Sequence, residues 1–236
     1  MIRLNILVEG QTEENFVRDV LTDHLFHYGV HVYRRSLKTG KTRRINSSGN
    51  RETKEHKGGG VTYQRLRDDL TLWRKQDQDA ILTTMIDFYG LKNDFPKSNL
   101  PSNLAIEKVE ALEAQLASDF RLANFIPYVQ MHEFEALLFS DVQILNEIVS
   151  TDSLPNPKTL QSLLEIRAQS QTPEHINDSP LTAPSKRLAQ VYEGRYGKTE
   201  GNIVASLIGL ATIRRECRHF DAWLTKLENL NSQGAS

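Results

Sequence analysis

Residues 4–14 read Leu4-Asn5-Ile6-Leu7-Val8-Glu9-Gly10-Gln11-Thr12-Glu13-Glu14, and this segment predicts the architecture of the chain. An apolar run typical of a buried strand ends at Glu9 and Gly10, and a helix follows. Ligands of an open α/β sheet collect beyond the carboxyl ends of its strands, so Glu9 lies where a functional carboxylate is expected. Gly10 allows a tight turn and Thr12 is the expected N-cap.

Glu13 follows Glu9 by four residues, close enough across a short turn for both side chains to approach one point. Two converging carboxylates repel each other unless a positive group lies between them, and a divalent cation is the usual solution. The plainer alternative is that Glu9 ends a strand and that Glu13 and Glu14 complement the dipole of the helix.

The composition is that of an ordinary soluble protein. The 236 residues are 39% hydrophobic and 25% charged, which argues against a disordered chain. The single cysteine, Cys217, excludes an intrachain disulfide and a cysteine-based zinc cluster. No apolar run approaches the roughly 18 residues that span a bilayer, and the first strand follows Met1 without a secretory signal. We therefore expect a cytoplasmic protein with no membrane association.

Two further predicted strands are also followed by acidic residues. The apolar run at 79–86 ends at Asp87, and a third strand at 125–130 precedes Glu133 and Glu135. Taken alone, Asp87 would be better explained by an Asx-turn at a strand end. Glu133 and Glu135 face the same way if the chain stays extended and diverge by about 200° if a helix has begun, and the sequence leaves this open.

Helical periodicity separates these strands and predicts a parallel sheet. The expected helices are 13–28, 61–75 and 105–120, and a further strand is expected at 30–33. Pro127 places the strand at 125–130 near an edge of the sheet. In a parallel sheet the three acid-bearing strand ends meet in one crevice.

A strongly basic segment follows the strand at 30–33. Residues 34–67 contain eleven lysine or arginine residues and two glutamates, a local charge of +9. Glycines and serines predict a loop insertion over 34–60 with a short hairpin around 38–45. Such a segment beside carboxylates suggests a nucleic acid held against a metal site, whereas a solvated surface loop is the alternative. The residues expected to contact nucleic acid are Arg34, Arg35, Lys38, Lys41, Arg43, Arg44 and Lys57, with Lys186 and Arg187 from later in the chain.

From residue 141 onward the pattern becomes helical. Helices are expected at 145–149, 160–168, 185–192, 203–217 and 220–230. We expect a catalytic α/β domain over 1–140, a helical C-terminal region over 141–231 and a disordered tail at 232–236.

Several motifs together resemble a known fold. Val8-Glu9-Gly10-Gln11-Thr12-Glu13 matches an E-G-x-T-E motif, and Ile86-Asp87-Phe88-Tyr89 stands where a D-x-D motif is found. They resemble the TOPRIM fold of topoisomerases, primases and nucleases of the overcoming-lysogenization-defect (OLD) type. With the segments 132–139, 185–187 and 208–210, nearly the whole chain is similar to a bacterial family assigned to the TOPRIM group, the domain of unknown function 4276.

The resemblance implies a TOPRIM-like, Rossmann-like sheet with a bound Mg²⁺ or Mn²⁺. The implied metal ligands are Glu9, Asp87 and one of Glu133 or Glu135, with Glu13 as a ligand of a second metal. This chain departs from the pattern at Tyr89, which stands in place of the second aspartate of D-x-D; Asp94 replaces it only if the following loop folds back. The resemblance further implies DNA or RNA as partner, an ATPase encoded nearby and a role in defence against phages or plasmids, and it allows an oligomer.

The first hypothesis is therefore a divalent-metal-dependent nuclease with Glu9, Asp87, Glu133 and Glu135 as catalytic residues. A second hypothesis, favoured by Tyr89, is a non-catalytic nucleic-acid-binding or regulatory subunit with a degraded metal site. A third is a phosphate-transfer enzyme acting on a small substrate, against which the lack of a G-x-x-x-x-G-K loop argues.

Overall fold

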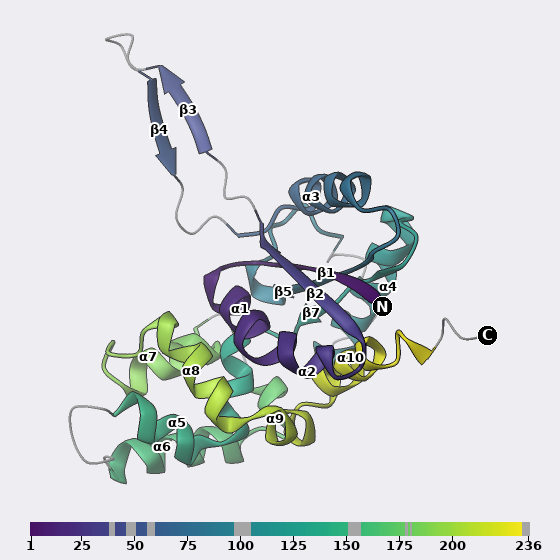
Figure 1. Ribbon diagram of the computed structural model, residues 1–236. Coiled ribbons are helices and arrows are strands. Elements are labelled where there is room, and N and C mark those ends of the chain that lie inside the picture. Colours follow the sequence, from purple (N-terminus) through teal and green to yellow (C-terminus); the bar gives the residue numbers. More distant parts are fainter. Residues whose placement is uncertain are drawn as a thin grey trace.

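The computed structural model describes residues 1–37, 41–45, 51–55, 60–96, 105–150, 157–177, 179 and 181–232. Its centre is a parallel sheet with the order β2-β1-β5-β6 (Figure 1). The strands are β1 (Ile2–Val8), β2 (Val30–Ser36), β5 (Ile81–Asp87) and β6 (Phe125–Ile126), and β7 (Val129–Gln130) pairs with the end of β5. The expected α/β class with a mostly parallel sheet is confirmed.

The third predicted strand is interrupted. β6 pairs with β5 through Leu82 and Phe125, and β7 pairs with it through Ile86 and Val129. Pro127 and Tyr128 lie between the two segments. Proline has no N–H to donate a hydrogen bond to a neighbouring strand, so the strand is interrupted here. Both segments pair with β5 alone in the described sheet, which agrees with the edge position expected from Pro127.

Apolar side chains alternate between the two faces of the sheet and produce two cores. Leu4, Ile6 and Val8 of β1 face a core that includes α1 (Gln11–Phe16) and α10 (Arg218–Glu228). Leu7 faces a second core with α3 (Tyr63–Gln76) and α4 (Ala105–Phe120). The helices on the two faces can be followed in Figure 1. This period-two alternation is the expected pattern of a strand buried on both sides.

The helix predicted at 13–28 begins earlier and is not uniform. It consists of α1 (Gln11–Phe16), a π-helical turn (Val17–Leu21) and α2 (Thr22–Phe26). Gly10 is the N-cap, so the expected cap at Thr12 is wrong. Gly10 is extended, with φ of −149°, and the chain turns after α2 at Gly29, where φ is +73°.

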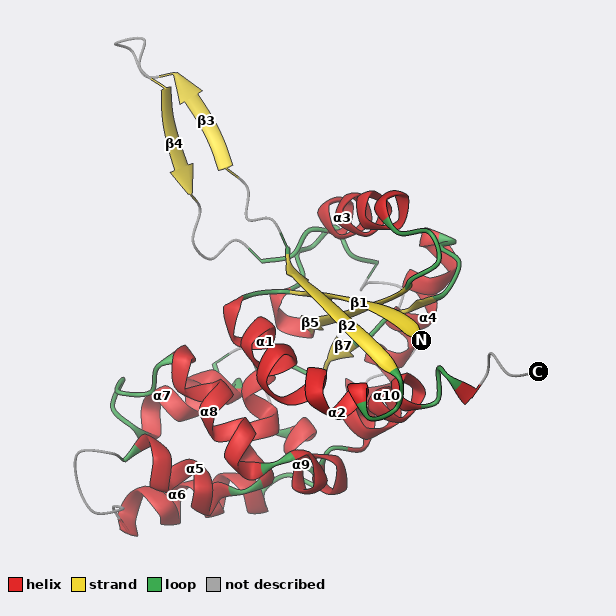
Figure 2. Cartoon of the chain, in the orientation of Figure 1, coloured by secondary structure: helices red, strands yellow, loops and turns green. Residues whose placement is uncertain are grey.

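The loop insertion predicted over 34–60 is wrong in two places. Arg34 and Arg35 belong to β2, which runs to Ser36 instead of ending at residue 33. The predicted hairpin exists but lies later, with β3 (Lys41–Ile45) antiparallel to β4 (Arg51–Glu55). Figure 2 shows it projecting from the body of the molecule. Lys38 and Lys57 lie outside the described residues.

The C-terminal part is helical as expected. Its helices are α5 (Val142–Val149), α6 (Pro157–Ala168), α7 (Pro184–Val191), α8 (Lys198–Ile208), α9 (Leu210–Glu216) and α10 (Arg218–Glu228). The single helix predicted at 203–217 is wrong, because Gly209 has φ of +77° and separates α8 from α9. The domain boundary at residue 140 stays a prediction, and residues 233–236 lie outside the described residues.

Among the described residues, the helices are all too short or too polar to cross a membrane.

Candidate functional site

At the carboxyl end of the sheet, four glutamates lie close enough to Asp87 for their charges to act on it. Burial raises the pKa of Asp87, the last residue of β5, well above its ordinary range. The charges of Glu13, Glu9, Glu135 and Glu133 raise it further, in that order of effect. Charges act strongly only at short range, so the fold brings together acids from three separate segments. We call these five residues the carboxylate cluster.

Glu9 is held against the backbone at the end of β5. The backbone N–H of Asp87 donates to Glu9 Oε2 at 3.2 Å, and the N–H of Glu9 donates to the carbonyl oxygen of Met85, also at 3.2 Å. Gly90 leaves room for this carboxylate: a Cβ atom at Gly90 would lie 2.3 Å from Oε2 and 2.5 Å from Oε1 of Glu9. Any other residue at position 90 would displace Glu9 or itself.

Glu13 is oriented by the turn that precedes it. Its Oε2 accepts a hydrogen bond from the N–H of Gly10 at 3.0 Å, which is the capping interaction expected for an acid at the third helical position. The side chain is only 7% exposed. Glu13 therefore caps α1 and also belongs to the carboxylate cluster.

Glu133 and Glu135 have different environments. Glu133 is extended, and a seven-residue 3-10 helix, Phe134–Ser140, begins directly after it. Oε2 of Glu133 accepts a hydrogen bond from the N–H of Ser185, in the first turn of α7, at 2.9 Å. Glu135 is 4% exposed and acts more strongly on Asp87 than Glu133 does. Both residues therefore contribute to the cluster, with unequal effect on Asp87.

The donor atoms of the cluster suit a hard cation. Oδ1 of Asp87 is buried and has no hydrogen-bond partner within the described chain. A buried carboxylate oxygen without a partner is costly, and carboxylate oxygens are the ligands that Mg²⁺ and Mn²⁺ prefer. No three Asp, Glu, His or Cys side chains in the described ranges are already grouped tightly enough to hold a metal ion. The carboxylate donor set and the partnerless Oδ1 of Asp87 are the two features that fit a cation.

His132 is a residue at this edge to which the sequence assigned no role. It has φ of +62°, an unusual conformation for a residue with a side chain. Burial, with a smaller contribution from His175, lowers the pKa of His132 to about 4, so the imidazole is neutral at pH 7. Its ring lies 5.2 Å from that of Tyr89, and its carbonyl oxygen accepts a hydrogen bond from the N–H of Tyr89. Backbone strain of this kind leaves no signal in the sequence.

Tyr89 therefore packs on His132 at the position where the D-x-D pattern has an aspartate. Among the described residues, no contact of Asp94 puts its carboxylate in the place of that aspartate. Its Oδ2 accepts a hydrogen bond from the N–H of Tyr63, at the start of α3, at 2.9 Å. This hydrogen bond holds Asp94 at the start of α3.

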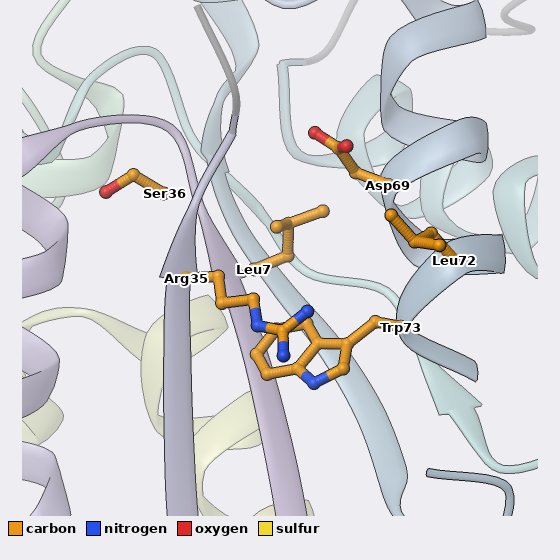
Figure 3. Close-up of a pocket in the computed structure, with 6 residues that line it drawn as sticks. All are labelled: Leu7, Arg35, Ser36, Asp69, Leu72 and Trp73. Atoms are coloured by element: carbon orange, nitrogen blue, oxygen red, sulfur yellow. The ribbon is translucent and has the colours of Figure 1, made fainter. Parts of the chain in front are cut away.

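The cationic residues proposed for nucleic-acid contact are spread over several elements. Arg35 lies with its guanidinium carbon 4.5 Å from the ring centre of Trp73 and donates to Gln76, beside a small pocket between β2 and α3 (Figure 3). Nε of Arg34 is buried without a hydrogen-bond partner in the described chain. Lys186 is exposed on α7, whereas Arg187 donates to the carbonyl oxygen of Thr182. For Lys41, Arg43 and Arg44 the structure describes only the backbone, in β3.

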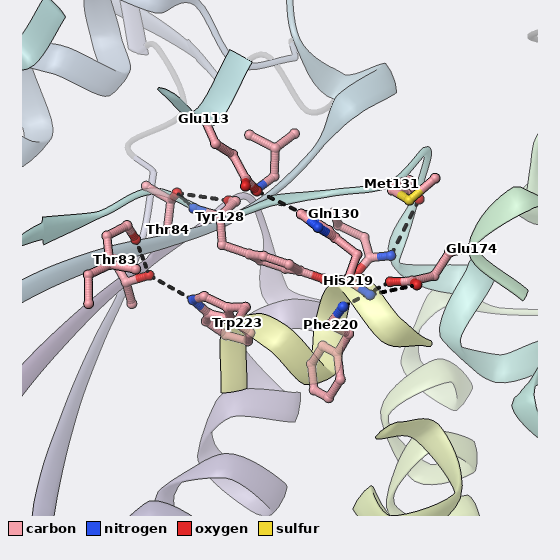
Figure 4. Close-up of polar contacts among 12 residues, drawn as sticks. Thr83, Thr84, Glu113, Tyr128, Gln130, Met131, Glu174, His219, Phe220 and Trp223 are labelled. Carbon is pink, nitrogen blue, oxygen red and sulfur yellow. Dashed lines mark hydrogen bonds and ion pairs between the residues drawn. The ribbon is translucent and has the colours of Figure 1, made fainter. Parts of the chain in front are cut away.

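A buried polar network fixes the strand that leads to Glu133 (Figure 4). Glu113 Oε1 accepts a hydrogen bond from the N–H of Val129 at 2.7 Å and pairs with Nε2 of His219 at 3.0 Å. Tyr128 stacks on Trp223, with ring centres 4.3 Å apart, and Trp223 donates to Thr83 Oγ1. Helix α10 is thereby attached to both β5 and the strand beside it.

Glu174 completes this network from the segment before α7. Its two carboxylate oxygens accept hydrogen bonds from the N–H groups of His219 and Phe220, each at 3.0 Å. Burial raises the pKa of Glu174 despite these two hydrogen bonds. The N-terminus of α10 is thus capped by a side chain that lies 45 residues away in the sequence.

Comparisons with known proteins gave a match to a sequence family and a similarity to a solved structure. A family model described as "Domain of unknown function (DUF4276)" matches residues 8–228. Among curated proteins there is no match. A solved structure, the C-terminal region of the Xanthomonas campestris pv. campestris OLD protein, is similar to this chain with 17% identity, 95% of each chain covered and a TM-score of 0.38.

Proposed function

The chain belongs to the family of the domain of unknown function DUF4276, and from its carboxylate cluster we propose a divalent-metal-dependent nuclease that cleaves phosphodiester bonds of DNA or RNA. The observation that carries this proposal is Asp87: its buried Oδ1 has no hydrogen-bond partner in the described chain, and the charges of four further carboxylates act on it. The motifs around Glu9 and Asp87, which resemble TOPRIM motifs, add support from the sequence.

We assign the cation to Glu9, Asp87 and Glu135, with Glu13 and Glu133 beside them. Mg²⁺ or Mn²⁺ bound there would neutralise the carboxylates, activate water and stabilise the leaving oxygen of a phosphodiester. Backbone N–H groups already orient three of the five carboxylates. Glu9 accepts from Asp87, Glu13 accepts from Gly10, and Glu133 accepts from Ser185. Such fixed orientation lowers the cost of forming a ligand set.

The basic segment supplies the affinity for a polyanion in this proposal. Residues 34–67 carry a net charge of +9 in a chain whose overall charge is −1. The phosphate backbone dominates the affinity of most nucleic-acid-binding proteins, and lysine and arginine neutralise it without regard to base sequence. We therefore expect binding that weakens steeply with salt and depends little on sequence.

The test compares the wild type with Glu9→Gln and Asp87→Asn on labelled single- and double-stranded DNA and RNA. Each reaction contains Mg²⁺, Mn²⁺ or EDTA. We expect cleavage by the wild type with a metal, none in EDTA, and loss of cleavage in both variants without loss of the folded state. Glu107→Gln, which changes an exposed acid on α4, is the matched control and should retain full activity.

Full cleavage by both variants, or cleavage that persists in EDTA, would contradict the proposal. Nucleic-acid binding by the wild type without cleavage under any metal would instead favour a regulatory subunit with a degraded metal site.

A further inference from the structure

Tyr196 brings an unpartnered hydroxyl from the C-terminal helices. It lies between α7 and Gly197, the N-cap of α8. Its hydroxyl oxygen is buried and makes no hydrogen bond within the described residues. Buried hydroxyl groups almost always have a partner, so each exception calls for an explanation such as a bound ligand or water.

The position of this hydroxyl follows from the space around Gly201, in α8. A Cβ atom placed on Gly201 would lie 2.9 Å from the Tyr196 hydroxyl oxygen, 3.5 Å from the methyl carbon of Thr12 and 3.5 Å from the ring of Phe134. Thr12 adjoins Glu13, and Phe134 lies between Glu133 and Glu135. The hydroxyl therefore lies beside the two segments that carry three members of the carboxylate cluster.

The electrostatic surroundings agree with this position. Burial raises the pKa of Tyr196, and the charges of Glu135, Glu200, Glu133 and Glu13 raise it further. The phenol consequently stays protonated and can donate a hydrogen bond. The charged groups that act on it are all acceptors, yet it is bonded to none of them within the described chain.

We propose that the Tyr196 hydroxyl donates a hydrogen bond to a phosphate oxygen of a ligand bound at the carboxylate cluster. A phosphate group that approaches five carboxylates needs positive or donating groups on its other side, because the acids alone repel it. A bound cation would supply the positive charge, and the Tyr196 hydroxyl would supply the hydrogen-bond donor. This inference rests on the proposed function in so far as it assumes a phosphate ligand and a cation at the cluster.

Gly201 belongs to the same arrangement. Because the added Cβ atom would lie 2.9 Å from the hydroxyl oxygen, closer than an ordinary contact, the Gly201→Ala side chain would push the phenol away from its place. The glycine therefore provides the space in which the donor sits, and Gly201→Ala should weaken phosphate binding in the same direction as loss of the hydroxyl.

The test uses inorganic phosphate as the probe, titrated by calorimetry into the full-length protein saturated with Mn²⁺. In Tyr196→Phe we expect phosphate to bind at least fivefold more weakly, while the affinity for Mn²⁺ alone stays within twofold of the wild type. Tyr192→Phe is the matched control, because Tyr192 is a buried tyrosine from the same segment whose hydroxyl already donates to the carbonyl oxygen of Leu145. It should change neither affinity.

Thermal unfolding supplies a second readout. Tyr196→Phe removes a buried hydroxyl that has no partner in the described part of the protein, so its melting temperature should be equal to or above that of the wild type, whereas Tyr192→Phe should melt lower. A lower melting temperature for Tyr196→Phe would mean that the hydroxyl has a structural role, and would overturn the inference. Unchanged phosphate affinity in Tyr196→Phe, or no phosphate binding by the wild type, would also overturn it.

Cleavage assays on the same proteins separate this inference from the proposed function. Tyr196-dependent phosphate binding in a wild type that cleaves no nucleic acid would leave the inference standing and refute the nuclease. Metal-dependent cleavage by the wild type, together with unchanged phosphate affinity in Tyr196→Phe, would support the nuclease and refute the inference about Tyr196.

Discussion

Gly90→Ala is the substitution that tests the geometry of Glu9 most directly. The added Cβ atom would lie 2.3 Å and 2.5 Å from the two carboxylate oxygens of Glu9, where ordinary contacts begin at 3.4 Å. The carboxylate would have to retreat by about 1 Å, which would break the hydrogen bond from the N–H of Asp87 at 3.2 Å. Hydrogen bonds to charged groups contribute about 1.5–3 kcal/mol.

The expected result is a ten- to hundredfold loss of Mn²⁺ affinity, equivalent to about 1.4–2.8 kcal/mol. The fold should survive because the displaced group is the end of a flexible side chain. Mn²⁺ affinity is measured by calorimetry and the free energy of unfolding by urea titration. Nuclease activity should fall by about a hundredfold, since misplacement by about 1 Å is enough for a loss of that size.

Gly209→Ala is the control for the effect of an alanine in place of glycine. A Cβ atom there meets nothing within 4 Å, but φ is +77°, so the variant should lose about 1 kcal/mol of stability and keep its Mn²⁺ affinity. Wild-type Mn²⁺ affinity in Gly90→Ala would refute the reasoning, because Glu9 would then not belong to the cation site.

Three further predictions concern the parts of the molecule that support the site. Glu174→Ala leaves two buried N–H groups at the start of α10 without acceptors, at about 1–3 kcal/mol each, so urea titration should show a loss of about 2–6 kcal/mol; a loss under about 1 kcal/mol would contradict the capping role. Burial lowers the pKa of His219, but its hydrogen bond and charge interaction with Glu113 outweigh burial and raise it. The folded state therefore binds this proton more tightly than the unfolded state, and the resulting stability is full below about pH 6.5 and is lost as the pH rises through the folded pKa. His219→Gln should abolish that part of the pH dependence in urea titrations, and an unchanged slope would argue against the pair. Replacing residues 38–59, which contain seven lysine or arginine residues, by a short Gly-Ser linker should weaken nucleic-acid binding and flatten its salt dependence in fluorescence anisotropy; equal salt slopes would exclude the hairpin segment from the interface.

Strand and helix positions with strong periodicity could be predicted from the sequence. The helix at 105–120 has the predicted ends, and the strands that carry Glu9 and Asp87 lie within a residue or two of their expected positions. These segments combine regular apolar spacing with burial on a face of the sheet, so local pattern and tertiary environment agree. The same pattern predicted the parallel topology, which puts Asp87 and the residue after β1, Glu9, at one end of the sheet.

The differences arise where contacts between distant residues determine local structure. β2 continues through Arg34 and Arg35 because both residues pair with β1, and Arg35 also packs on Trp73; no local charge pattern reveals either contact. The break at Gly209 interrupts a segment whose apolar spacing is continuous, and only its positive φ distinguishes it. Tyr196 lies in a segment without periodicity, so its approach to the carboxylate cluster had no signal in the sequence.

The attachment of α10 to the sheet also bears on the order in which the protein is made. Thr83 bonds to Trp223 across 140 residues and Glu113 to His219 across 106. During synthesis the strands that carry Asp87 and Glu133 emerge long before the helix that covers them, because chains are made at about 5–20 residues per second. Tyr128 and its neighbours should therefore remain uncovered until residues 218–228 leave the ribosome. A nascent chain stalled before residue 218 should then lack the helix that fixes the strand leading to Glu133.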